Sequence, residues 1–110
     1  MRINIKPLSI NEAWKGKLKP TGAQTKYKRD VGMLLRPDKN IPTEGNLTVE
    51  IVFGFSSKAA DIDNPLKLFL DCLQDYYGFD DKQIYELIVK KEVVKRGQEY
   101  IDYFIKSVDK

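Results

Sequence analysis

The stretch 61–81 constrains the fold most strongly, because it marks both ends of a helix. Its apolar residues recur at steps of three and four, which predicts one amphipathic helix. Pro65 precedes that pattern, where a helix tolerates proline, and Gly78 follows it, where a left-handed cap is favoured. We expect Asp63 or Asn64 to cap the first turn with its side chain. The predicted apolar stripe comprises Leu66, Phe69, Leu70 and Leu73, closed by Tyr76 or Tyr77.

The same stretch is strongly acidic within a basic chain. It holds six of the sixteen acidic residues and one basic residue, Lys67, so its net charge is −5 in a chain of +3. The remaining residues therefore sum to +8. A compact negative site in a positive shell suits a metal-dependent enzyme that acts on a polyanion, because carboxylates bind the cation and lysines bind the phosphates. The alternative is a solvated acidic helix face, and the spacing argues against it.

The spacing brings the charged residues together from two sides. Asp61 and Asp63 are two residues apart, so on an extended segment their side chains leave on the same face. Lys67 lies four residues after Asp63, one turn into the helix, and its ammonium can return to the carboxylates. Asp80 and Asp81 follow the glycine cap on a return loop. We therefore expect three or four carboxylates to converge with one lysine.

Composition bounds the class of protein. The 110 residues make one domain, 1–110, and 42% hydrophobic with 11% aromatic residues is typical of a globular chain. No apolar run approaches a membrane span and the N-terminal residues lack a signal-peptide core, so we expect a cytoplasmic protein without a membrane partner. The single cysteine, Cys72, excludes an internal disulfide and a cysteine-rich zinc site; it is more typical of a packed thiol than of a nucleophile.

Histidine is absent from the chain, and this excludes several kinds of chemistry. Ser-His-Asp and Cys-His catalysis and histidine-ligated zinc hydrolysis are ruled out. The remaining candidates use carboxylates, lysine, tyrosine or a hard, oxygen-bound metal. Mg²⁺ is the expected cofactor, with Mn²⁺ as a possible substitute.

A basic region precedes the acidic stretch. The first forty residues hold ten basic and three acidic side chains. Charge runs are commonly solvated helix faces, but this excess has one sign and is not balanced by neighbouring acids, which favours contact with phosphates. The predicted DNA-binding residues are Lys15, Lys17, Lys19, Lys26, Lys28 and Arg29.

The remaining segments complete an α+β fold. A short strand at 1–5 precedes Pro7, and a helix is predicted over 25–35 with Val31, Leu34 and Leu35 supplying its apolar contacts. Strict alternation over 47–55 predicts the clearest strand, and β-branched runs at 84–94 and 99–108 predict two more.

The expected order is β-α-β-α-β-β. The two helical crossovers imply parallel neighbours, and a hairpin at 95–98 implies an antiparallel pair of final strands. The result is a mixed four-stranded sheet with two packed helices. Asp61 follows the strand at 47–55, and sites in α/β sheets lie beyond the carboxyl ends of strands.

Carboxylates around Mg²⁺ with a lysine are the components of phosphodiester hydrolysis. The pattern here is Asp-Ile-Asp-Asn at 61–64, Lys67 four residues after the second aspartate, and Gly-Phe-Asp-Asp at 78–81 before a β-branched strand. At these residues the chain resembles the RusA-type Holliday junction resolvases (crossover junction endodeoxyribonucleases), small enzymes of phages and prophages. The resemblance extends more weakly to Pro7, Ser9, Asn11 and Trp14.

The resemblance implies a set of roles. Asp61, Asp63 and Asp81 would bind the metal and Lys67 would be the catalytic lysine, with Asp80, Asn64 and Asn11 as supporting residues. Members of the family are Mg²⁺-dependent homodimers that bind four-way DNA junctions and nick two strands symmetrically. The sequence departs from the pattern at Pro65 and in a shorter stretch before the aspartate pair, so Asp80 stays an alternative to Asp81.

One alternative function and two ordinary structural roles remain. A non-catalytic basic module that binds nucleic acid would account for the basic region, but it has no use for clustered carboxylates, which repel DNA. On the helix, Asp71 lies four residues after Lys67, and we favour a surface ion pair between them over a metal role. Asp75 is expected to be solvated.

Overall fold

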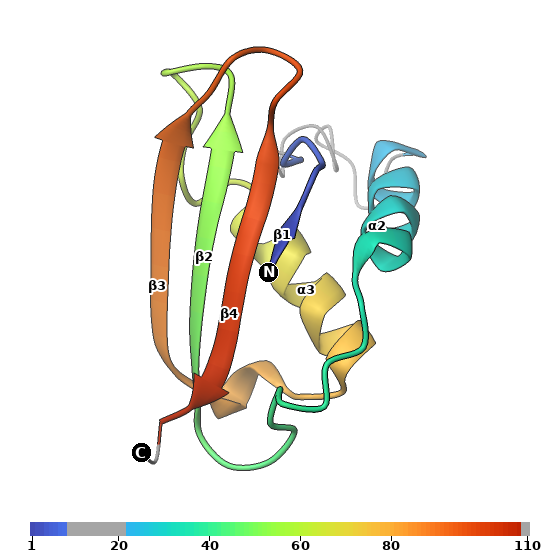
Figure 1. Cartoon of the computed structure of the whole chain (residues 1–110), viewed down its shortest axis with the longest axis vertical. Coiled ribbons are helices and arrows are strands. Elements are labelled where there is room, and N and C mark those ends of the chain that lie inside the picture. The colour runs from blue at the N-terminus through green and yellow to red at the C-terminus, as the bar shows by residue number, and fades with distance from the viewer. Residues whose placement is uncertain (9–21, 109–110) are drawn as a thin grey trace.

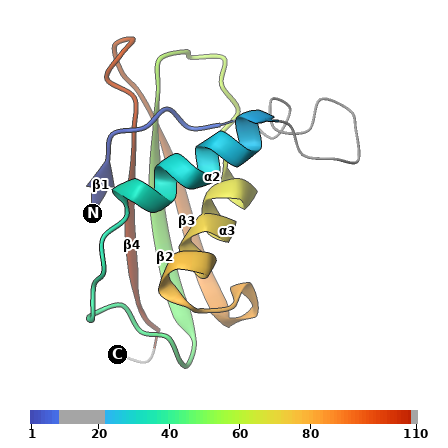
Figure 2. The same cartoon turned by 90° about the vertical axis from the view of Figure 1, so that its right-hand side faces the viewer.

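The computed structural model describes residues 1–8 and 22–108, and it places two α-helices on one face of a four-stranded sheet (Figures 1 and 2). The predicted α+β class is confirmed. The elements in chain order are β1 (Arg2–Ile3), α2 (Gly22–Leu34), β2 (Leu47–Phe55), α3 (Leu66–Tyr77), a 3₁₀ turn η1 (Asp81–Gln83), β3 (Ile84–Val93) and β4 (Tyr100–Ser107).

The strands lie in the order β1-β4-β2-β3. β2 and β3 are parallel neighbours, as the α3 crossover predicts. The other predicted parallel pair, β1 with β2, is wrong, because β4 lies between those strands and pairs antiparallel with both.

The predicted β3–β4 hairpin is also wrong as a strand pair. A turn does form at 95–98, with Gly97 at a φ of 92° and the Gln98 amide donating to the Lys95 carbonyl. The connection, however, passes over the end of β2, where the Val94 amide donates to the Phe55 carbonyl. β2 takes the central position because it is mostly buried, whereas the charged and exposed β3 suits an edge.

The core lies between the helices and the face of the sheet that they cover. β2 contributes Leu47, Val49, Ile51 and Phe53, and β4 contributes Ile101, Tyr103 and Ile105. The opposite face of the sheet has no covering layer among the described residues (Figure 2). On that face the ring of Tyr100 lies over Gly54, where any Cβ would collide with it.

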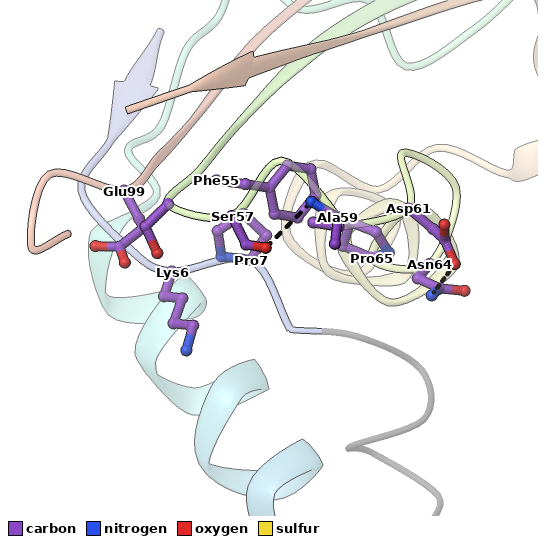
Figure 3. Close-up of a pocket in the computed structure, with 11 residues that line it drawn as sticks. Lys6, Pro7, Phe55, Ser57, Ala59, Asp61, Asn64, Pro65 and Glu99 are labelled. Carbon is purple, nitrogen blue, oxygen red and sulfur yellow. Dashed lines mark hydrogen bonds between the residues drawn. The ribbon is translucent and has the colours of Figure 1, made fainter. Parts of the chain in front are cut away.

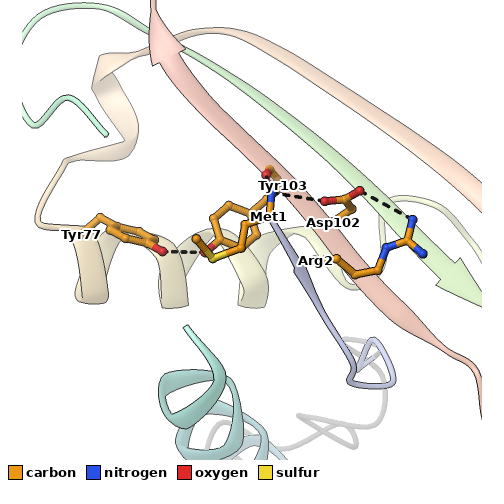
Figure 4. A network of polar contacts seen from close by, with 5 residues as sticks. All are labelled: Met1, Arg2, Tyr77, Asp102 and Tyr103. Carbon is orange, nitrogen blue, oxygen red and sulfur yellow. Dashed lines mark hydrogen bonds and ion pairs between the residues drawn. The ribbon is translucent and has the colours of Figure 1, made fainter. Parts of the chain in front are cut away.

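The first strand is shorter than the predicted 1–5 and is fixed to β4 by polar contacts (Figure 4). The Tyr103 amide donates to the Met1 carbonyl at 2.9 Å, and the Asp102 carboxylate pairs with Arg2 at 3.7 Å. The hydroxyls of Tyr103 and Tyr77 are 2.5 Å apart, which links β4 to α3. Burial raises the pKa of Tyr103, so this link is uncharged at neutral pH.

Helix α2 spans 22–34 where 25–35 was predicted. Val31 and Leu35 are buried as expected, but Leu34 is 37% exposed, and Tyr27 takes the third buried apolar position of this segment. Several predicted residues lie outside the described part of the chain: Ser9, Asn11, Trp14, Lys15, Lys17 and Lys19.

Candidate active site

One face of α3 carries most of the predicted site. Lys67, Asp71 and Gln74 follow each other on α3 at steps of three or four residues, so they share a side of the helix, and Asp63 lies in the turn just before it. With Asp81 they line a recess of about 240 Å³, here named the α3 recess; Leu66 and Leu70 complete its lining. The structure therefore brings together three of the four predicted catalytic residues, Asp63, Lys67 and Asp81.

Asp81 reaches this recess because the chain turns back at the end of α3. Gly78 adopts the predicted left-handed cap, with φ 82°, and its amide donates to the Gln74 carbonyl at 2.8 Å. Phe79 is buried and anchors the return. The next residue, Asp80, begins η1 as its N-cap.

The two aspartates of the pair have different surroundings. The Asp80 carboxylate accepts a hydrogen bond from the Lys82 amide at 3.0 Å, and this bond is the main cause that lowers the pKa of Asp80. Its own amide donates to Gln83 Oε1, which completes a capping box. Of the two aspartates, Asp81 and not Asp80 lines the α3 recess.

Asp61 lies in a different cavity (Figure 3), although extended geometry predicted it beside Asp63. The reason is local: residues 62–65 form a turn, so the two side chains do not leave on one face. The Asp61 cavity has a volume of about 290 Å³ and is lined by Lys6, Pro7, Glu99 and eight residues of 55–65. At one end Asn64 Nδ2 donates to Asp61 Oδ2 at 3.2 Å, while Lys6 and Glu99 stand at the other end.

The predicted side-chain cap of α3 is wrong. Pro65 itself is the N-cap, with helical backbone angles, and no side chain bonds the first amides there. The Leu66 amide donates to the Asp63 carbonyl at 3.2 Å, and the regular helical bonds begin with the Phe69 amide donating to the Pro65 carbonyl at 3.2 Å. Asn64 instead bonds Asp61, and Asp63 is left exposed toward the α3 recess.

The loop that carries Asp61 is attached to the edge strand β3. Lys91 Nζ donates to the carbonyls of Lys58 at 2.8 Å and Ala60 at 2.6 Å. Lys91 pairs with Phe53 in the β2–β3 register, so it leaves β3 on the helix-covered side. A lysine on that side is the one sequence signal that could have revealed this contact.

Lys67 is exposed, and within the described residues it makes no ion pair with Asp63 or Asp71. The predicted surface pair with Asp71 is therefore absent. Asp75 is exposed, as expected. The charge of Lys67 is left available to a ligand in the α3 recess.

The donor set in the α3 recess is chemically suited to a hard cation. Carboxylate oxygens are preferred by Mg²⁺ and Mn²⁺, and Asp63, Asp71 and Asp81 all line the recess. Within residues 1–8 and 22–108, however, no three ligand side chains are close enough to hold one metal ion. The predicted convergence of three or four carboxylates is therefore absent from this structure.

The described part of the basic region is partly neutralised by one acid. Asp30 pairs with Lys26 at 2.6 Å and with Arg29 at 3.7 Å, and the Lys26 hydrogen bond is the main cause that lowers the pKa of Asp30. Lys28 takes no part in these pairs. Asp30 thus reduces the net charge that this face of α2 presents.

Cys72 is a packed thiol, as predicted. It is buried in α3, and burial is the main cause that raises its pKa to about 11. At neutral pH it is therefore a neutral core residue and not a nucleophile.

The comparison with protein families decides the class. The family model "Endodeoxyribonuclease RusA" matches residues 11–102, which is most of the chain and includes the whole α3 recess. The chain belongs to the RusA family. It is therefore an endodeoxyribonuclease of the Holliday junction resolvase type, and the alternative of a non-catalytic nucleic-acid-binding module is overturned. No match was found among curated proteins.

None of the helices in the described part of this RusA-family chain is long and apolar enough to cross a membrane. Two residues that contribute to the site were missed from the sequence. Gln74 bonds the Asp81 amide and Lys91 bonds the Asp61 loop. The Gln74 contact has no sequence signal, because it depends on how the chain returns after Gly78.

Proposed function

We propose that the chain is a Mg²⁺-dependent endonuclease, with Mn²⁺ as a possible substitute, that resolves four-way DNA junctions by paired, symmetric nicks. The observation that carries this proposal is the α3 recess, in which Lys67 lies with Asp63 and Asp81. Membership of the RusA family supports the junction as substrate. Phosphodiester hydrolysis by this route needs carboxylates for a metal ion and a positive side chain beside the phosphate, and this recess is lined by carboxylates and by Lys67.

In the proposed site, Asp61, Asp63 and Asp81 would be the ligands of the cation. Binding it requires a movement of the loops that carry them, because the structure places Asp61 in the neighbouring cavity and brings no three such ligands together within the described residues. A bound Mg²⁺ supplies activation of water and offsets charge on the phosphate. Lys67 contributes a positive charge beside the phosphate that develops negative charge during cleavage. Asp80 and Asn64 support the loops that present these carboxylates, and Asn11 is proposed as a further supporting residue on the family resemblance alone.

The basic side chains are proposed to hold the arms of the junction. Lys6 stands in the Asp61 cavity, and Lys28 is the member of the described basic set that is outside the Asp30 pairs. Lys26 and Arg29 can exchange Asp30 for DNA phosphates, because exposed ion pairs are weak. Lys15, Lys17 and Lys19 are proposed as contacts on charge alone.

The experiment that tests the proposal compares aspartate variants on a labelled four-way junction with and without Mg²⁺. Asp61→Asn, Asp63→Asn and Asp81→Asn should each lower cleavage by at least about 100-fold, because a ligand charge is lost. Binding of the junction should persist or tighten, since negative charge near phosphate is removed. Asp75→Asn is the matched control, an exposed aspartate on α3 outside the α3 recess, and it should cleave normally.

Two results would contradict this assignment. Cleavage that is independent of divalent cations would remove the metal from the proposal. Loss of junction binding in parallel with loss of cleavage would give the aspartates a role in folding and none in the reaction.

A further inference from the structure

Gln74 lies on the last turns of α3 and makes contacts in two directions. Its Nε2 donates to the Leu70 carbonyl of its own helix at 3.3 Å. Its Oε1 accepts a hydrogen bond from the main-chain amide of Asp81 at 2.8 Å. The side chain is half-buried and lines the α3 recess with Asp63, Lys67 and Asp81.

The bond to Asp81 satisfies a donor that the fold leaves open. Asp81 is the first residue of η1, and the first amides of a helical turn have no partner within the turn. Asp80, the N-cap, supplies its carboxylate to Lys82 and not to Asp81. Gln74 therefore supplies the hydrogen-bond acceptor for the Asp81 amide, which the Asp80 carboxylate does not bond.

The rest of this turn is anchored to a different part of the molecule. Gln83 accepts a hydrogen bond from the Asp80 amide, and its Nε2 donates to the carbonyls of Thr43 and Gly45 at 3.2 and 2.9 Å. These bonds tie η1 to the loop before β2. Gln74 is the described side chain that ties Asp81 directly to α3, the helix that also carries Lys67.

We propose that Gln74 is a positioning residue of the nuclease site, which fixes the Asp81 main chain against α3 and so sets the Asp81 carboxylate relative to Asp63 and Lys67. This inference rests on the proposed function, because it assigns Gln74 to the same metal site. A side chain that orients a metal-binding residue alters metal affinity when it is removed, by about 10- to 100-fold. A merely structural side chain alters stability and leaves metal affinity unchanged.

The test measures Mn²⁺ binding to the full chain by titration calorimetry, with thermal unfolding without metal as the fold control. Gln74→Met keeps the length of the side chain and removes the acceptor, and it should weaken Mn²⁺ binding at least about tenfold. Gln74→Glu keeps an oxygen for the Asp81 amide and should bind Mn²⁺ at least as tightly as the wild type. Gln83→Met removes the other anchor of the turn, and it should lower the melting temperature without the tenfold loss of affinity.

The outcomes separate the inference from the proposed function. Wild-type Mn²⁺ affinity in Gln74→Met, failure of Gln74→Glu to restore binding, or an equal loss in Gln83→Met would each overturn the positioning role while the metal site stands. A wild-type protein that binds no Mn²⁺ would overturn the metal site and the positioning role with it. Should Gln74→Met fail to fold, Gln74→Asn applies the same test, because it withdraws the amide by one methylene.

Discussion

The proposed role of Lys67 rests on its charge and not on packing in the core. It is exposed in the first turn of α3 and pairs with neither Asp63 nor Asp71 in the described structure. Lys67→Ala should therefore change the free energy of unfolding by no more than about 1 kcal/mol. Turnover on the junction should fall by about 10²- to 10³-fold, because a charge placed beside the reacting phosphate is removed.

The control for this variant is Lys82→Ala, an exposed lysine directly after Asp81 that is not part of the α3 recess. It should cleave the junction at a rate close to that of the wild type. Comparable turnover in Lys67→Ala and the wild type would leave Lys67 as an ordinary surface residue.

The residues that could be predicted are those on a regular element. Lys67 lies on the side of α3 that lines the recess with Asp63, as the four-residue spacing indicates, and Gly78 ends the helix as expected. Asp61 was misplaced because alternation was assumed where residues 62–65 form a turn. Gln74 was missed because its bond to Asp81 is a tertiary contact, formed after the chain reverses, and no local pattern encodes it.

At the scale of elements, the Asp61 loop depends on β3 for its position. Lys91 bonds two carbonyls of that loop, at residues 58 and 60. Lys91→Met keeps the aliphatic stem and removes the ammonium, so the loop should loosen while the core stays intact. Hydrogen exchange should show lost protection at the Ala60 amide, which bonds Ser57, and cleavage should fall by about 10-fold as Asp61 loses its support.

Lys90→Met is the matched control for this loop. Lys90 pairs with Val52 and leaves β3 on the uncovered face, away from the Asp61 loop. It should show unchanged exchange at Ala60. Equal exchange in Lys91→Met and Lys90→Met would mean that the Lys91 contacts do not hold the loop.

The sequence predicted the elements better than their arrangement. Helical and alternating periods depend on neighbouring residues, and α3, β2, β3 and β4 all appear close to the predicted ranges. Strand order depends on which strand tolerates exposure to solvent. The tight turn at 95–98 suggested that β3 pairs with β4, but the buried strand β2 lies between them. The mixed charges of β3 were the available signal that it is an edge strand.

At the scale of the whole molecule, the sheet has one open face, on which a few apolar residues lie among charged ones. Ile88, Glu50 and Phe104 form one row across β3, β2 and β4, and Phe104 is 54% exposed. The opposite side of β4, with Ile101, Tyr103 and Ile105, lies in the core. On the open face of β4, Tyr100 is buried within its own chain and Phe104 is exposed, while Val108, just after the strand, is half-buried.

We expect a symmetric dimer from the symmetry of the proposed substrate. A four-way junction offers two equivalent strands, whereas one chain presents one α3 recess, so two chains related by a two-fold axis match the proposed paired nicks. We expect the wild type to be a dimer at micromolar concentration in sedimentation equilibrium. Phe104→Lys should weaken the dimer at least about 30-fold, as loss of a central apolar contact does at interfaces, and it should uncouple the two nicks.

Met33→Lys is the control for this last change, because Met33 is 72% exposed but lies on α2, in the helical layer away from the open face of the sheet. It should leave the dimer and the coupling of the nicks unchanged. Weakening of the dimer by Met33→Lys and not by Phe104→Lys would move the interface to the helical side. A wild-type monomer that still cuts both strands of one junction together would refute the dimer, because a single recess would then serve both cuts.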